Sequence, residues 1–220
     1  VAALIVPSAT GQLTENGNRI GDITLDGSVG LIVVIGLLLG IAFGVVWVVI
    51  SPWLPDRAVV RGLVAAPVGV GLGSFALIDR FNPDFAVLGH DTLVVAVLVG
   101  LVASAAPALV LFDGWLDRRL PRPASVRSMS TAIYAALAVI GVALGGLMTL
   151  QQVFRSDSQP LGFTIIGMGI VTLAWWIRRV RGSDRKPGSL RLIAVGILLA
   201  GTLAGYSSVI RDVAGAAGLG

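Results

Sequence analysis

Apolar residues occur along the chain in blocks about as long as a bilayer is thick. The first block, residues 29–50, contains no charged side chain. At roughly 1.5 Å of rise per residue, a helix of this length crosses the roughly 30 Å hydrocarbon core. Five similar blocks follow, at 58–79, 92–112, 129–152, 160–178 and 189–210. The pattern predicts an all-α fold: a polytopic transmembrane helical bundle with six spanning helices.

The blocks divide the chain into three parts. Residues 1–28 form an N-terminal segment, 29–210 a transmembrane domain and 211–220 a C-terminal tail. We expect a loop or small hairpin over residues 8–28, because Gly and Asn tolerate the positive φ of turns. The turn pairs are Asn16-Gly17, Gly21-Asp22 and Asp26-Gly27. The apolar run at 1–7 is too short to span, and is either the remnant of a seventh, upstream helix or a short surface tail.

Two blocks contain an internal proline, Pro67 and Pro107. Proline removes one backbone hydrogen bond, which membrane helices tolerate where a neighbour satisfies the freed carbonyl. If the chain were a transporter, these prolines would break their helices near the membrane midplane. Arg61 lies near the start of the second block, and we expect its guanidinium to extend toward the lipid headgroups.

Composition agrees with a membrane protein. Hydrophobic residues make up 55% of the chain and charged residues 13%, about half the roughly 25% of a soluble domain. The mean hydropathy is +0.91. Arginine greatly outnumbers lysine, and Ala, Gly and Val are abundant, a bias typical of a GC-rich bacterial genome. We therefore expect a multi-pass protein of the bacterial plasma (inner) membrane.

The basic residues predict an orientation. Twelve fall in or beside the segments that follow the first, third and fifth blocks, with four acidic residues; the opposite side has four basic and eight acidic residues. Because basic loops stay in the cytoplasm, we expect both ends of the chain to be extracytoplasmic. The tryptophans agree, since all five lie at the cytoplasmic ends, where indole rings favour the headgroup level and their N–H groups find partners. They are Trp47, Trp53, Trp115, Trp175 and Trp176.

Glycines recur at four-residue spacing in four blocks. Residues four apart share one helix face, and small residues there let backbones approach closely. The expected helix-packing residues are Gly36, Gly40, Gly44, Gly69, Gly73, Gly141, Gly145, Gly201 and Gly205. Two interpretations stay open, packing within the bundle and docking of a partner subunit onto the first helix.

The block centres contain hydroxyls rather than charges, namely Ser74, Ser104, Thr172 and Thr202. We expect each to hydrogen-bond to a carbonyl of its own preceding turn. Since a coupled transporter needs buried ionisable groups, this pattern argues against proton or ion coupling.

The outer segment 79–91 is the one cluster of potential metal ligands. Asp84, His90 and Asp91 combine oxygen and imidazole donors, which can hold a divalent ion, but their spacing matches no known metal motif. In the alternative interpretation Asn82-Pro83 turns the chain and Asp91 caps the third helix.

No cofactor is expected. A bis-His haem needs two imidazoles and the chain has one, and no phosphate-binding loop or nucleophile elbow is present. The net charge of +4 lies in short loops between apolar blocks, so we expect no nucleic-acid partner.

Three functional hypotheses remain. The favoured one is a non-catalytic accessory or scaffold subunit of a membrane complex, whose partners are the lipid bilayer and either other membrane subunits or further copies of the chain. The alternatives are a transporter or channel for a small neutral or amphiphilic solute, and a membrane enzyme that uses the outer segment 79–91.

Overall fold

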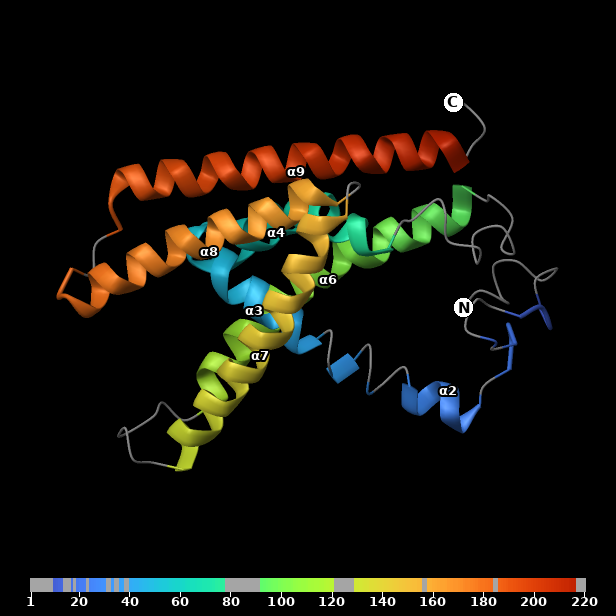
Figure 1. Ribbon diagram of the computed structural model, residues 1–220, viewed down its shortest axis with the longest axis horizontal. Coiled ribbons are helices and arrows are strands. Elements are labelled where there is room, and N and C mark those ends of the chain that lie inside the picture. The colour runs from blue at the N-terminus through green and yellow to red at the C-terminus, as the bar shows by residue number, and fades with distance from the viewer. Residues whose placement is uncertain are drawn as a thin grey trace.

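The computed structural model describes residues 10–13, 17, 19–22, 24–30, 33, 36–37, 40–77, 92–120, 129–155, 158–183 and 186–216. Within these ranges the fold is all-helical (Figure 1). The helices are α2 (Leu25–Gly30), α3 (Gly40–Ile50), the 3-10 turn η3 (Ser51–Trp53), α4 (Ala58–Leu77), α6 (Thr92–Arg119), α7 (Met129–Phe154), α8 (Gln159–Val180) and α9 (Gly188–Ala216).

In the part of the chain that the structure describes, four helices are long and apolar enough to cross a membrane: α6, α7, α8 and α9. Within the described residues, α3 and α4 contribute shorter apolar stretches, Phe43–Trp53 and Ala58–Gly73. The chain is therefore an all-helical protein whose long apolar helices fit a membrane, as the sequence predicts. The predicted number of six spans is not confirmed, since four candidates are found among the described residues.

Two predicted boundaries need correction. The third block was expected to end at 112, yet α6 continues to Arg119, so the basic pair Arg118 and Arg119 lies on a helix instead of in the following loop. Near the N-terminus, Gly11, Gly17 and Gly21 adopt positive φ and Leu13 pairs with Arg19 in an antiparallel bridge. These features fit the expected hairpin. Asp26-Gly27, by contrast, lies inside α2 and makes no turn.

The two internal prolines do not break their helices. α4 runs through Pro67 and α6 runs through Pro107 without interruption. Tyr206 on α9 donates its hydroxyl hydrogen to the carbonyl oxygen of Pro67 at 3.1 Å. The broken helices that the transporter hypothesis assumes are therefore not found at these two prolines.

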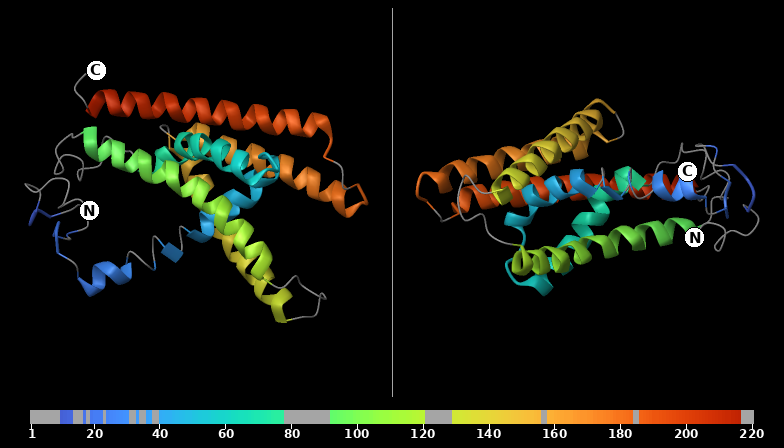
Figure 2. Two further views of the ribbon diagram at one scale, coloured as in Figure 1. Left: turned by 180° about the vertical axis from the view of Figure 1, so that it is seen from behind. Right: turned by 90° about the horizontal axis from the view of Figure 1, so that it is seen from below.

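Helix α4 is the central element of one half of the structure. It lies beside both α6 and α9, while α8 joins this group to the other half by contacting α9 and α7 (Figure 2). Helix α3 packs on α7 and α8. The core where these helices meet contains fully buried Met168 and Ala194 on α8 and α9.

Glycines permit the closest approaches of α4. A Cβ placed on Gly71 would lie 2.8 Å from both the Cγ2 and the carbonyl oxygen of Thr202 on α9. One on Gly69 would lie 2.9 Å from the Cβ of Ala106 on α6. Gly205 on α9 faces the backbone of Gly71 itself. Because real Cβ atoms are not found at such distances, any side chain at these positions would push the helices apart.

We predict that Gly71→Ala destabilises the protein by about 1–3 kcal/mol, since the added methyl meets the α9 backbone as well as the Thr202 side chain, and the backbone cannot rotate away. Gly146→Ala on α7 is the matched control, because a Cβ there meets none of the described residues within 4 Å. The measurement is reversible unfolding in detergent. Equal stability of the two variants would contradict the proposed contact between α4 and α9.

Candidate functional site

The connection from α3 to α4 folds into the helix core. Trp53 of η3 is 5% exposed, and its Nε1 donates a hydrogen bond to Thr172 Oγ1 on α8 at 2.8 Å. Thr172 in turn donates to the carbonyl oxygen of Val49 on α3 at 2.7 Å. One hydroxyl thus joins the end of α3, the following turn and α8 in a single buried chain of hydrogen bonds.

The five tryptophans that were expected at the cytoplasmic ends of the helices do not share one environment. Trp53 and Trp175 are buried in the core and make an edge-to-face contact, with ring centroids 6.1 Å apart. Trp115 and Trp176 are 44% and 41% exposed, as expected for interfacial residues. The indole N–H groups of Trp47 and Trp175 are buried and have no hydrogen-bond partner among the described residues, contrary to expectation.

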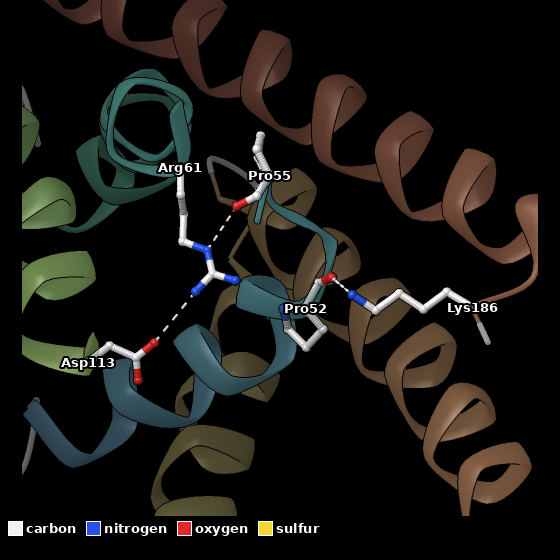
Figure 3. Close-up of polar contacts among 5 residues, drawn as sticks. All are labelled: Pro52, Pro55, Arg61, Asp113 and Lys186. Atoms are coloured by element: carbon white, nitrogen blue, oxygen red, sulfur yellow. Dashed lines mark hydrogen bonds and ion pairs between the residues drawn. The ribbon is translucent and has the colours of Figure 1, made fainter. Parts of the chain in front are cut away.

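Arg61 is held by groups of the protein (Figure 3). Its Nε donates to the carbonyl oxygen of Pro55 at 3.1 Å, and its Nη1 lies 3.8 Å from the Oδ2 of Asp113 on α6. The two side chains are 24% and 38% exposed, so solvent screening limits the ion pair to about 1 kcal/mol or less. The pair joins the start of α4 to the last part of α6. The sequence alone does not reveal this pair, because it depends on α4 and α6 lying side by side.

Lys186 connects the segment before α9 to the turn after α3 (Figure 3). Its Nζ donates to the carbonyl oxygen of Pro52 at 2.5 Å and lies 5.3 Å from the centre of the Trp175 ring. The guanidinium of Arg179 lies 5.7 Å from the same ring centre. We call Trp175, Arg179 and Lys186 the Trp175 cluster.

Helix α6 contains a second aromatic and basic group. Phe112 and Trp115 stack with ring centroids 5.5 Å apart, and the guanidinium of Arg119 lies 5.5 Å from the Trp115 ring centre. Both aromatic side chains are exposed. Trp115 lies about one turn before the end of α6, and Trp175 has a similar position on α8.

The central hydroxyls follow the expected pattern only in part. Ser104 bonds to the carbonyl of Leu101 in its own helix, as predicted. Thr172 bonds across helices, as described above, and the buried Thr202 hydroxyl has no partner in the described part of the chain. The side chain of Ser74 lies outside the described residues.

The nine predicted packing glycines have different surroundings. Beyond Gly69 and Gly205, a Cβ on Gly73 would meet Val102, one on Gly141 would meet Val45 and Ile41, and one on Gly201 would meet Thr164. Gly145 is buried, and its carbonyl accepts a hydrogen bond from Thr149.

The glycine repeat of the first block differs from the other repeats. A Cβ on Gly40 or Gly44 would have none of the described residues within 4 Å. We call the side of α3 that contains Gly40 and Gly44 the open α3 face; Gly36, the third glycine of the repeat, is exposed and precedes α3. The adjacent side of α3, containing Ile41 and Val45, contacts Gly141 on α7.

The predicted metal ligands Asp84, His90 and Asp91 lie outside the described residues. Within the described ranges, no group of three or more His, Asp or Glu side chains is arranged to hold a metal ion.

No family model matches this chain, and comparisons with curated proteins and with solved structures return no match.

We predict that Thr172→Val lowers the free energy of unfolding by about 1–3 kcal/mol, because it leaves the buried Trp53 N–H without an acceptor. Thr172→Ser is the control, since it keeps the hydroxyl that joins Trp53 to Val49. Unfolding in detergent, followed by tryptophan fluorescence, would measure both variants. A Val variant as stable as the Ser variant would show that the hydrogen-bond chain contributes nothing.

Proposed function

We propose that this protein is a non-catalytic accessory or scaffold subunit of a membrane complex, and that its open α3 face docks the partner subunit. The observation that carries the proposal is the difference between the four-residue glycine repeat of α3 and the repeats of the other helices. Gly69, Gly73, Gly141, Gly201 and Gly205 face neighbouring helices, whereas Gly40 and Gly44 face none of the described residues.

The energetics of membrane helices support this use of the face. Lipid chains are as apolar as leucine, so helices associate through close packing and gain little from apolar side chains alone. Glycines four apart expose backbone to a partner at short range. Exposed apolar side chains border the face, with Leu37 56% and Phe43 47% exposed, and would extend the contact with a partner helix.

We further propose a six-span topology in the bacterial plasma membrane. In this topology α3 and α4 cross the membrane in addition to the four long apolar helices. The basic connections lie in the cytoplasm and both chain ends lie outside. Helix α4 has 20 residues, about the number needed to cross the hydrocarbon core. The contact of Lys186 with Pro52 supports placing the connections after the first and fifth blocks on one side.

The docking proposal predicts that Gly40→Leu weakens association with the partner about tenfold or more, because a bulky side chain blocks close helix approach. The matched control is Gly146→Leu, also at a position open among the described residues. Native mass spectrometry of the complex, extracted in mild detergent from its own membrane, would compare the heteromeric and free populations. Equal retention of the partner by both variants, or a chain that is only monomeric or homo-oligomeric, would contradict the proposal.

The proposed topology predicts that two single-cysteine variants are labelled from opposite sides of the membrane. Each variant reports on one position, because the sequence contains no other cysteine. An impermeant maleimide should label Thr10→Cys in intact cells and Asp56→Cys only after the membrane is opened. Both positions are exposed. Labelling of both from the outside would mean that α3 does not cross, and six spans would be wrong.

A further inference from the structure

Helices α3 and α7 contain the same short pattern of small and bulky residues. The pattern is Gly40-Ile41-Ala42-Phe43-Gly44 in α3 and Gly141-Val142-Ala143-Leu144-Gly145 in α7. Each begins and ends with glycine, has alanine in the middle and has a bulky apolar residue at the two positions between. Because residues four apart share one helix face, each pattern leaves backbone without side-chain cover on that face.

In α7 the glycines of this pattern are covered from within the chain. A Cβ on Gly141 would lie 2.6 Å from the Cγ2 of Val45 and 3.4 Å from the Cγ2 of Ile41. These two γ-methyl groups belong to β-branched residues four apart on α3, which packs on α7 (Figure 1). Both Gly141 and Gly145 are buried. The chain thus shows one way to cover the pattern, with two β-branched side chains four residues apart on a neighbouring helix.

Branching at Cβ suits these side chains to this contact. It places a methyl group next to the helix backbone, so two backbones can approach closely while the methyl group touches the glycine. A leucine branches one atom further out. Valine and isoleucine also have one strongly preferred χ1 rotamer in a helix, so docking removes little side-chain freedom. In a bilayer, where close packing drives helix association, both properties favour the bound state.

In α3 the same pattern has no such cover. A Cβ on Gly40 or Gly44 would have none of the described residues within 4 Å, and the α3 residues Ile41 and Val45 are already engaged with Gly141. We propose that the open α3 face binds a transmembrane helix of the partner subunit that has isoleucine or valine at two positions four residues apart. This inference rests on the proposed function and adds the chemistry of the partner helix to it.

The test measures binding of synthetic transmembrane peptides to the full chain in lipid vesicles by fluorescence energy transfer. The chain carries the donor dye on Asp56→Cys, its only cysteine, and each peptide carries the acceptor. One peptide is a leucine-rich helix with lysines at both ends and one isoleucine and one valine four residues apart; the matched peptide has alanine at both positions. The β-branched peptide should bind about tenfold more tightly or better, because alanine removes the contacting γ-methyl groups.

Two variants show where the peptide binds. Gly40→Leu should abolish the preference for the β-branched peptide, because the leucine side chain blocks close approach. Gly146→Leu, at a position on α7 that is also open among the described residues, should retain it. The helix content of both variants, measured by circular dichroism, should match that of the unsubstituted chain.

The possible outcomes separate this inference from the proposed function. Equal affinity for the two peptides, or a preference that survives Gly40→Leu, would overturn the inference and leave the proposed function standing. Association between donor-labelled and acceptor-labelled copies of the chain that Gly40→Leu abolishes would identify a second copy as the occupant, and would also overturn it. A preference for the β-branched peptide in a chain that copurifies with no partner would contradict the proposed function, while the selectivity of the face would stand.

Discussion

Close backbone approach between α4 and α9 is the constraint on which the arrangement of the helices depends. Gly71 and Gly205 lie face to face, and Thr202 covers the position that a Gly71 side chain would occupy. In a bilayer, close packing must supply the association that the hydrophobic effect supplies in water. With α4 fixed on α9, Gly69 brings α6 to its other side, and α8 follows through its contact with α9. The remaining helices, α3 and α7, are then placed through α8.

The end of the structure that contains Arg61, Asp113 and Lys186 is held together by polar contacts instead of close backbone packing. Polar contacts join segments that are distant in sequence: Trp53 with Thr172, Arg61 with Asp113 and Lys186 with Pro52. Two of the three use a main-chain or hydroxyl group that no charge pattern would reveal. The turn after α3, the start of α4, the later part of α6, the middle of α8 and the segment before α9 are thereby connected. In the proposed function, the open α3 face is the surface left for a partner subunit.

The apolar blocks predicted the helices well because length and hydropathy are local properties. The block at 160–178 corresponds closely to α8, and 189–210 lies within α9. The end of the third block was misjudged because a charged residue ends an apolar block without ending a helix, and α6 continues beyond the apolar part. Both prolines lie in uninterrupted helices, in agreement with the expectation that a membrane helix held between neighbours can absorb one missing hydrogen bond.

Candidate-site residues were harder to predict, because their roles depend on what lies opposite them. The four-residue repeat identified Gly69, Gly205 and Gly141, but Gly71 belongs to no such repeat, and only the position of α9 reveals its role. Thr172 and Ser104 look alike in sequence, yet one bonds across helices and the other within its own. The repeat also could not distinguish Gly40, which faces none of the described residues, from Gly141, which faces α3.

The most direct test of the central claim, that the open α3 face docks a partner subunit, is photocrosslinking in the native membrane. A photoreactive residue at Phe43, beside Gly40 and Gly44, would be compared with one at Val142 on α7, which is 64% exposed. The account predicts a single protein adduct from position 43, to a different chain that also copurifies in fixed ratio, and only lipid adducts from position 142. Lipid adducts alone at position 43, or an adduct to a second copy of this chain, would contradict it.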